Sequence, residues 1–234
     1  MWHCIFLFNR NRVDVMLGKT SRDQAEIVRK TYIAFIALIC VWIIAWIVKI
    51  QLDKIAGKTD LGSFIYWTTA KLLIWIAPAL WLIRLSGRNL KQVFNLPNYK
   101  RWLLWGAGVG LILALPGMIL NYVKGTSILQ NQFDYGLVNA LVISPIFEEL
   151  LIHGAIMGNL QMGYSFMCSN LISALMFVML HLPGWYFMGT FISNLTRIDG
   201  VISIFVIGLM CGYAVKRSNS VLGGMIAHFI NNLV

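Results

Sequence analysis

Long apolar runs divide this sequence into segments of the length that crosses a membrane. The longer runs cover residues 32–50, 64–83, 102–120, 135–160, 164–182 and 201–215, and shorter apolar segments cover 185–195 and 221–234. The second run holds Lys71 near its first third. Because a helix needs about 20 apolar residues to cross a bilayer, we predict an all-α, polytopic integral membrane protein with about eight transmembrane or intramembrane helices.

The composition supports this assignment, because 59% of the 234 residues are hydrophobic and only 12% are charged, whereas soluble domains carry about 25% charged residues. The net charge is +10, with basic residues gathered before the first run and in the segment 84–101. Such clusters are typical of membrane-flanking loops, so we expect the lipid bilayer, and no nucleic acid, to be their partner. The four cysteines show neither a disulfide framework nor a zinc pattern.

The charge pattern also gives an organisation and an orientation. We divide the chain into a basic cytoplasmic segment 1–30, N-terminal transmembrane helices 31–130 and a membrane core 131–234, in what we expect to be a bacterial plasma membrane. Loop charge puts the segment 84–101 in the cytoplasm. The side on which Lys216 and Arg217 emerge depends on the segment 185–195. A full crossing would put them outside, and a short helix that does not cross would put them in the cytoplasm.

The first eight residues are apolar but lack a basic n-region and a small-residue cleavage site, so they do not indicate a signal peptide. Met1 and Met16 both fit as the start of translation, because a basic stretch follows Met16.

Tryptophan is frequent in the apolar runs. We expect its indole rings near span ends or facing lipid, where such rings are common in membrane proteins. The positions concerned are Trp42, Trp67, Trp81, Trp102 and Trp105.

Two adjacent carboxylates interrupt the run 135–160. Glu148 and Glu149 lie at membrane depth, where each costs about 2.5 kcal/mol or more. Ser144 followed by Pro145 predicts that a helix begins there, which would put Glu148 just past its first turn. Glu149 and His153 are four residues apart and can pair on one helical face, so Glu148 is left to face a cavity.

Two further motifs place polar side chains in the same half of the chain. His181 ends an apolar run, and His228 and Asn232 are four residues apart, hence on one helical face. Together with the two glutamates they supply a carboxylate base, an imidazole and a histidine–asparagine pair, enough to activate water and to stabilise an oxyanion. No His-Glu-x-x-His zinc motif and no serine nucleophile arrangement is evident.

The ordered set of motifs resembles that of the CAAX protease and bacteriocin-processing family, also called Abi, which includes the type II CAAX prenyl endopeptidases. The motifs are Glu148-Glu149-x-x-x-His153-Gly154, Phe177-x-x-x-His181, and Phe205-x-x-Gly208-x-x-x-Gly212 followed by His228-x-x-x-Asn232. The resemblance covers roughly residues 137–234, and we expect its glycine-rich segment, 205–212, to serve close helix packing.

The resemblance implies an eight-helix intramembrane endopeptidase with a glutamate-based mechanism that needs no metal or other cofactor. By this analogy Glu148 and His181 activate water, and His228 and Asn232 hold the oxyanion. We therefore take these four residues and Glu149 as catalytic, with His153 as a supporting residue. The expected substrate is a peptide or a membrane-associated protein, such as a bacteriocin or signal-peptide precursor, and immunity to such peptides is a related role.

The sequence departs from the family pattern at one position, because His153 stands where the family usually has arginine. A non-catalytic membrane scaffold of the same fold, binding a partner protein, therefore stays open as an alternative. A metal-dependent protease with Glu148, His181 and His228 as ligands is a second alternative. A transporter that uses the carboxylates as a proton relay is a third. The sequence indicates no oligomeric state.

Overall fold

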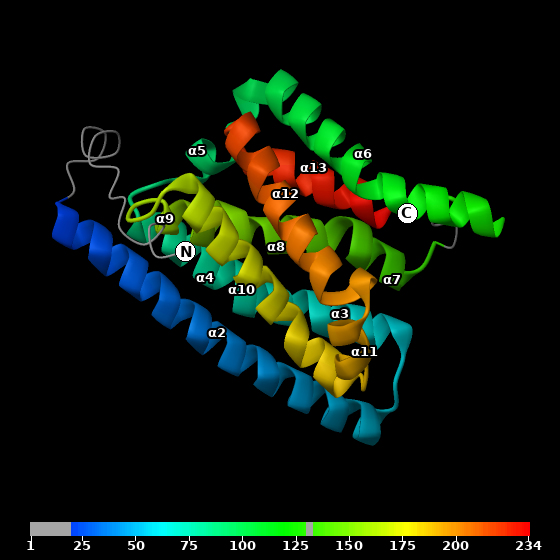
Figure 1. The fold of residues 1–234 in the computed structure, drawn as a ribbon. Helices are drawn as coiled ribbons and strands as arrows, with labels where there is room; N and C mark the ends of the chain where they lie inside the picture. The colour runs from blue at the N-terminus through cyan, green and yellow to red at the C-terminus, as the bar shows by residue number, and fades with distance from the viewer. Residues whose placement is uncertain (1–19, 130–132) are drawn as a thin grey trace.

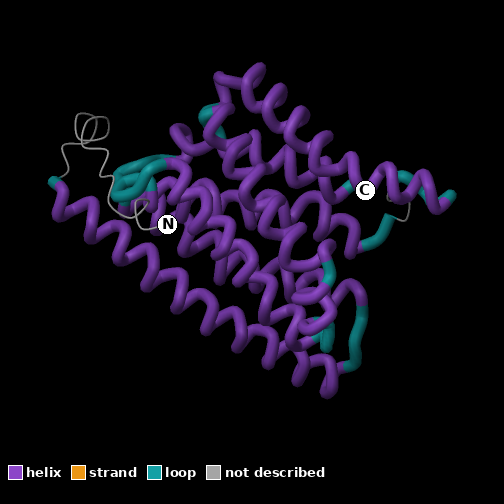
Figure 2. The backbone as a smooth tube through the Cα atoms, in the orientation of Figure 1, coloured by secondary structure: helices purple, strands orange, loops and turns teal. Residues whose placement is uncertain are grey.

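The computed structural model of this chain describes residues 20–129 and 133–234, and every regular element in those two ranges is helical (Figures 1 and 2). The expectations about the start of translation and about a signal peptide lie outside the described residues. The α-helices are α2 (Ser21–Ala56), α3 (Asp60–Lys71), α4 (Ala77–Leu85), α5 (Leu90–Phe94), α6 (Tyr99–Lys124), α7 (Tyr135–Val138), α8 (Ser144–Glu149), α9 (Gly158–Leu160), α10 (Phe166–Phe187), α11 (Phe191–Thr196), α12 (Ser203–Ser218) and α13 (Val221–Asn232).

Several of these helices join end to end through π-helical turns and form longer rods. Leu72–Ile76 joins α3 to α4, and Asn139–Ile143 and Leu150–Met157 join α7, α8 and α9. Six segments are then long and apolar enough to cross a membrane: Ser21–Ala56, Asp60–Leu85, Leu90–Lys124, Tyr135–Leu160, Phe166–Phe187 and Ile198–Ser218. The prediction of an all-α integral membrane protein is confirmed.

The predicted number of about eight helices is not confirmed as a number of crossings. Two of the expected helices are short, since α11 has 6 residues and α13 has 12. At 1.5 Å per residue, neither reaches across a hydrocarbon layer of about 30 Å. An apolar segment of the sequence can cross the membrane, but it can also be buried in protein without crossing.

The short α11 decides where Lys216 and Arg217 lie. Because α11 does not cross, α12 runs back toward the end of the bundle from which α10 started. The Arg101 guanidinium donates to the Arg217 carbonyl at 3.0 Å, and Asn98 Nδ2 donates to the Ser218 carbonyl at 2.8 Å. The loop around 84–101 and the loop around 216–220 therefore share one end of the molecule, which we call the basic end. The positive-inside rule predicts that this end is cytoplasmic.

The rod Tyr135–Leu160 lies inside the bundle and is its most enclosed span, with 61% of its apolar window buried. All eight residues of Leu150–Met157 are buried. In Figure 1 this rod passes behind α12 and α10, while α2 runs along one side of the bundle and α6 along the other. Side chains near the middle of the rod are therefore removed from lipid.

Glycines allow the helices around this rod to approach closely. A Cβ added at Gly208 would come within 3.2 Å of the Ala174 Cα in α10, and one at Gly212 would come within 1.9 Å of Asn170 Oδ1. The prediction that the glycine-rich segment serves close packing is confirmed. The same holds for the contact between α6 and α13. Gly106 and Gly110 of α6 have no side chain, so Ile226 and Ile230 of α13 can pack directly against the α6 backbone.

Candidate functional site

The helix that carries the two glutamates begins earlier than the sequence indicated. Ser144 has helical backbone angles, and the chain is already helical at Ile143. The true N-cap is Asp134, whose Oδ1 accepts from the Leu137 N–H at 2.7 Å. The predicted helix start at Ser144 is therefore wrong, and Glu148 lies about four turns inside the rod, beyond the reach of the positive helix end.

The physical reason for the wrong helix start is the π-helical turn Asn139–Ile143. Pro145 lacks an N–H and usually ends or kinks a helix. Here the wider turn just before it relaxes the hydrogen-bond ladder, so that the helix continues through the proline. The Ser144 hydroxyl is then free for another partner and accepts from Lys71 Nζ at 2.6 Å.

Glu149 is the more enclosed of the two carboxylates and is held by two histidines. Its side chain is 0% exposed, and its Oε2 lies 2.6 Å from His153 Nδ1. Its Oε1 lies 3.1 Å from His228 Nδ1, which comes from α13. The predicted Glu149–His153 pair is confirmed, and the link to His228 adds a connection between the rod and α13 that sequence spacing did not predict.

Glu148 has a different environment, although it is also buried. Lys71 Nζ lies 3.8 Å from its Oε1, and His228 Nε2 lies 3.9 Å from its Oε2. Both distances are too long for a direct hydrogen bond, and within the described residues the Glu148 carboxylate makes none. Polar groups separated by such distances are commonly bridged by water.

A cavity of about 230 Å³ borders Glu148 and contains the third histidine, His181. The His181 Nδ1 lies 2.9 Å from the Phe177 carbonyl, so this nitrogen donates to the carbonyl and the Nε2 of the neutral ring is an acceptor. The Phe177 ring contacts both His181 and His228 edge to face, with centroids 4.9 and 5.8 Å apart. Phe177 therefore packs against both imidazoles.

Asn232 is less directly connected to the glutamates. Its Nδ2 donates to the Ala140 carbonyl at 2.8 Å, and its Oδ1 accepts from Asn231 at 3.1 Å. Ala140 belongs to the π-helical turn that precedes Glu148. The amide of Asn232 thus ties the end of α13 to the rod and keeps one N–H without a partner among the described side chains.

Lys71 belongs to this cluster and was missed as a site residue by the sequence analysis. Its ammonium donates to Ser144 Oγ and lies 3.4 Å from Asn139 Oδ1 and 3.8 Å from Glu148. The signal that could have identified it was its position inside an apolar run, where a charged residue is costly and usually functional. Its distance of 77 positions from Glu148 along the chain hid the pairing.

Tryptophans line the rest of the cavity. Trp42 is 4% exposed and packs against Trp67 and Trp75 with ring centroids 5.3 and 4.7 Å apart. The expectation that Trp42 and Trp67 face lipid or mark span ends is therefore wrong for these two, whereas Trp81 is 48% exposed. The apolar lining consists of Trp42, Trp46, Trp67, Trp75, Trp185, Leu180 and Met188.

A metal site needs three or more ligating side chains that converge on one point. Among the residues that the structure describes, no three histidine, cysteine, aspartate or glutamate side chains converge in the way that holds a metal ion. Glu148, His181 and His228 therefore do not form a preformed ligand set, and the Lys71 ammonium lines the same cavity as Glu148 and His181.

A bundle of apolar helices that encloses two carboxylates, three histidines and a lysine defines an integral membrane protein with a polar centre suited to acid–base chemistry. Residues 131–234 match the family model of the type II CAAX prenyl endopeptidases, described as Rce1-like. The family relationship predicted from the motifs is thereby confirmed for this part of the chain, and it indicates a membrane endopeptidase. No curated protein and no solved structure matches the chain.

Proposed function

We propose that this chain is an intramembrane endopeptidase in which Glu148 activates a water molecule that attacks a peptide bond. The observation that supports this most directly is the contrast between the adjacent carboxylates. Glu149 is held by hydrogen bonds from His153 and His228, whereas Glu148 borders a cavity and, within the described residues, has no direct hydrogen bond. A general base needs a free acceptor beside the reacting water.

In the proposed reaction Glu148 takes a proton from water while the oxygen of that water bonds to the carbonyl carbon of the substrate. The carbon–nitrogen bond then breaks, and the proton held by Glu148 passes to the departing amine nitrogen. His181 lines the same cavity and presents Nε2 as an acceptor that can orient the water. The Lys71 ammonium at 3.8 Å stabilises the negative charge that Glu148 must carry at the start.

The oxyanion that forms in this reaction needs donors on the other side of the carbonyl. We assign this role to His228 and Asn232. His228 is fixed by Glu149 through Nδ1, so its Nε2 faces Glu148 at 3.9 Å and carries a proton in the imidazolium form. With Lys71, one protonated histidine would balance the two carboxylates in a dry interior, where uncompensated charge is costly.

The residues that line the cavity indicate which kind of substrate side chain would fit it. Its walls are largely indole rings, and two of them, Trp46 and Trp75, have Nε1 donors that are buried without a partner among the described residues. This combination suits a bulky apolar side chain next to a main-chain carbonyl. We therefore propose a peptide or a membrane-associated protein as substrate. Processing of bacteriocin or signal-peptide precursors, or immunity to such peptides, are the roles that fit a chain of this kind.

The test is a peptidase assay on the purified protein with a fluorogenic peptide library, with products identified by mass spectrometry. Glu148→Gln keeps the shape of the side chain and removes the base, so we expect cleavage to fall by a factor of about 10² to 10⁴ while the melting temperature stays close to that of the wild type. Near-normal turnover in this variant would sink the general-base assignment.

A control makes this assay specific. Asp53→Asn removes a carboxylate that pairs with Lys49 and does not line the cavity, so it should leave cleavage unchanged. If the wild-type protein cleaves no member of the library and Glu148→Gln only changes stability, the result favours the non-catalytic scaffold.

A further inference from the structure

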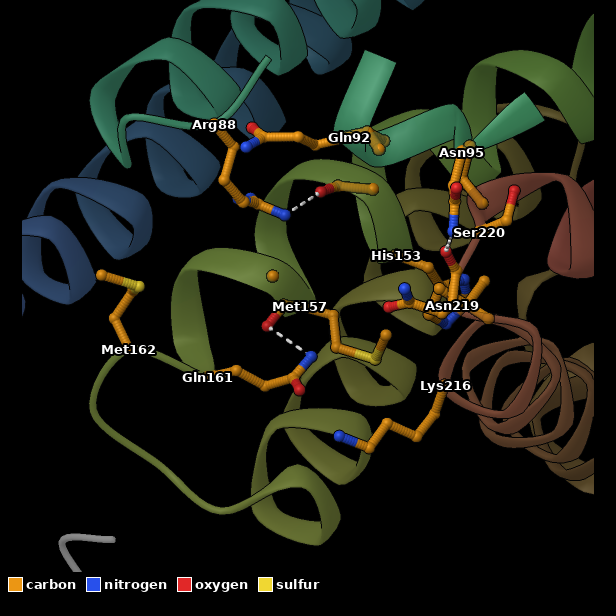
Figure 3. A pocket seen from close by; sticks show the side chains of 15 residues that line it. Arg88, Gln92, Asn95, His153, Met157, Gln161, Met162, Lys216, Asn219 and Ser220 are labelled. Atoms are coloured by element: carbon orange, nitrogen blue, oxygen red, sulfur yellow. Dashed lines mark hydrogen bonds between the residues drawn. The ribbon is translucent and has the colours of Figure 1, made fainter. Parts of the chain in front are cut away.

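A second and larger cavity lies at the basic end of the bundle, apart from the tryptophan-lined one. It has a volume of about 650 Å³, within the range of sites for small ligands and cofactors. We call it the basic-end pocket. It lies between α5, the end of the rod Tyr135–Leu160, the end of α12 and the start of α13 (Figure 3). Its polar lining consists of Arg88, Gln92, Asn95, His153, Gln161, Lys216, Asn219 and Ser220.

The charge of the described lining of this pocket is positive and uncompensated. Among the described residues the lining includes Arg88 and Lys216 and no aspartate or glutamate. In the same part of the chain the acceptors of Arg88 are neutral, and they include the Gly154 carbonyl at 2.9 Å and Asn159 Oδ1 at 2.7 Å. Burial lowers the pKa of Arg88 to about 10, so that it is still cationic at neutral pH. The Lys216 ammonium lies over the Phe166 ring, 5.5 Å from its centroid, and within the described residues it pairs with no carboxylate.

His153 adds a buried polar atom without a partner. It lines the pocket and is only 2% exposed, and its Nδ1 is engaged by Glu149. Its Nε2 has no hydrogen-bond partner within the described part of the chain. In a doubly protonated ring this Nε2–H would be a donor, which an anionic acceptor would satisfy.

We propose that the basic-end pocket binds a phosphate-bearing anion, held by Arg88, Lys216 and the Nε2–H of His153. Phosphate oxygens accept charge-assisted hydrogen bonds from guanidinium and ammonium groups, and the surrounding amides of Gln92, Gln161 and Asn219 supply further donors. The same chemistry is presented by an anionic phospholipid headgroup and by a soluble phosphate compound. The site is separate from the proposed cleavage, so it stands or falls independently of that function.

Binding of an anion in the basic-end pocket would also affect the candidate active site. His153 contacts the pocket on one side and Glu149 on the other, and Glu149 holds His228. One imidazolium ring can donate to an anion through Nε2 and to Glu149 through Nδ1, so the two contacts share one ring. The bound phosphate would therefore fix the geometry of the site from the basic end.

The test uses the purified full-length chain in nanodiscs and follows its melting temperature. Phosphatidylcholine discs are titrated with inorganic phosphate and with ADP, and separate discs contain phosphatidylglycerol without soluble phosphate. Lys216→Gln is compared with Lys100→Gln, which removes the same charge at the same end but outside the pocket; both lysines are exposed, so neither variant should fail to fold. We expect stabilisation of the wild type and of Lys100→Gln, and about tenfold weaker apparent affinity in Lys216→Gln.

The soluble-phosphate titrations and the phosphatidylglycerol discs distinguish the two possible ligands. A shift with phosphatidylglycerol alone identifies a lipid headgroup, and a shift with ADP or phosphate alone identifies a soluble compound. Equal responses of the two lysine variants would show a general surface-charge effect and overturn the proposal, as would the absence of a shift with every probe. The contact with His153 is read from ¹⁵N-histidine spectra, which contain only four histidines. An unchanged His153 Nε2 signal on saturation would overturn that contact.

Discussion

The bond between Glu149 and His153 provides the sharpest test of how the site is held. Replacing His153 by leucine removes one partner of a carboxylate that is 0% exposed, and it breaks a contact of 2.6 Å. Breaking a buried ionic pair by removing one partner costs about 3–5 kcal/mol. Glu149 keeps its second bond, to His228 at 3.1 Å, so the lower end of that range, about 3 kcal/mol, is the expected loss.

That loss corresponds to a drop of about 10 °C in melting temperature for a chain of this size, measured by thermal unfolding in nanodiscs. The matched control is the double variant Glu149→Gln with His153→Leu, because a neutral amide no longer needs a positive partner. A double-mutant cycle should give a coupling energy of about 2 kcal/mol or more between the two positions.

His153→Arg should be tolerated, because the basic-end pocket beside position 153 leaves room for a longer side chain and arginine restores the usual family pair. Peptide cleavage should therefore survive in the arginine variant and fall in the leucine variant. Additive effects in the cycle, with a coupling energy near zero, would refute the reasoning that the carboxylate depends on this imidazole. Poor activity of a well-folded arginine variant would instead indicate that His153 has a role beyond pairing.

Three further predictions concern the same site. Cleavage should survive strong chelators, and metal analysis should find no stoichiometric zinc; inhibition by phenanthroline that added zinc reverses would favour the metal-dependent alternative. Gly224→Ala would place a Cβ 2.5 Å from Glu149 Oε2, so cleavage should drop about tenfold or more. The control Gly108→Ala should not change cleavage, because a Cβ there meets nothing within 4 Å. Equal effects of the two variants would contradict the packing argument. Lys71→Met should reduce kcat about tenfold or more, because it removes the cation beside Glu148. Lys71→Arg keeps the positive charge and should retain part of the wild-type kcat. A methionine variant with unchanged kcat would exclude a role for this charge.

The apolar runs of the sequence were sufficient to predict the class of protein. Runs of about 20 apolar residues have few stable arrangements other than membrane helices, and the shortage of charged residues points the same way. The Glu149–His153 pair was also predictable, because two residues four positions apart on a helix face each other whatever surrounds them. Both predictions depend only on local geometry and on the solvent.

Contacts between distant helices could not be read from the sequence. Lys71 reaches Glu148 only because the rod Tyr135–Leu160 packs beside the span that carries the lysine, and no local pattern encodes that packing. The position of Trp42 is a similar case, since an indole ring on an apolar helix can face lipid or a cavity, and its neighbours decide which.

The helix start at Ser144 shows how tertiary structure can override a local signal. Serine followed by proline favours a helix N-terminus in isolation. In the folded chain the hydroxyl of Ser144 accepts from Lys71, and a π-helical turn accommodates Pro145, so the helix continues. Local sequence specifies which residues are apolar and which polar groups share a helical face. Only the packing of the helices decided that Glu149 is held by two histidines while Glu148 faces a cavity, because burial and partners at long sequence distance are properties of the assembled bundle.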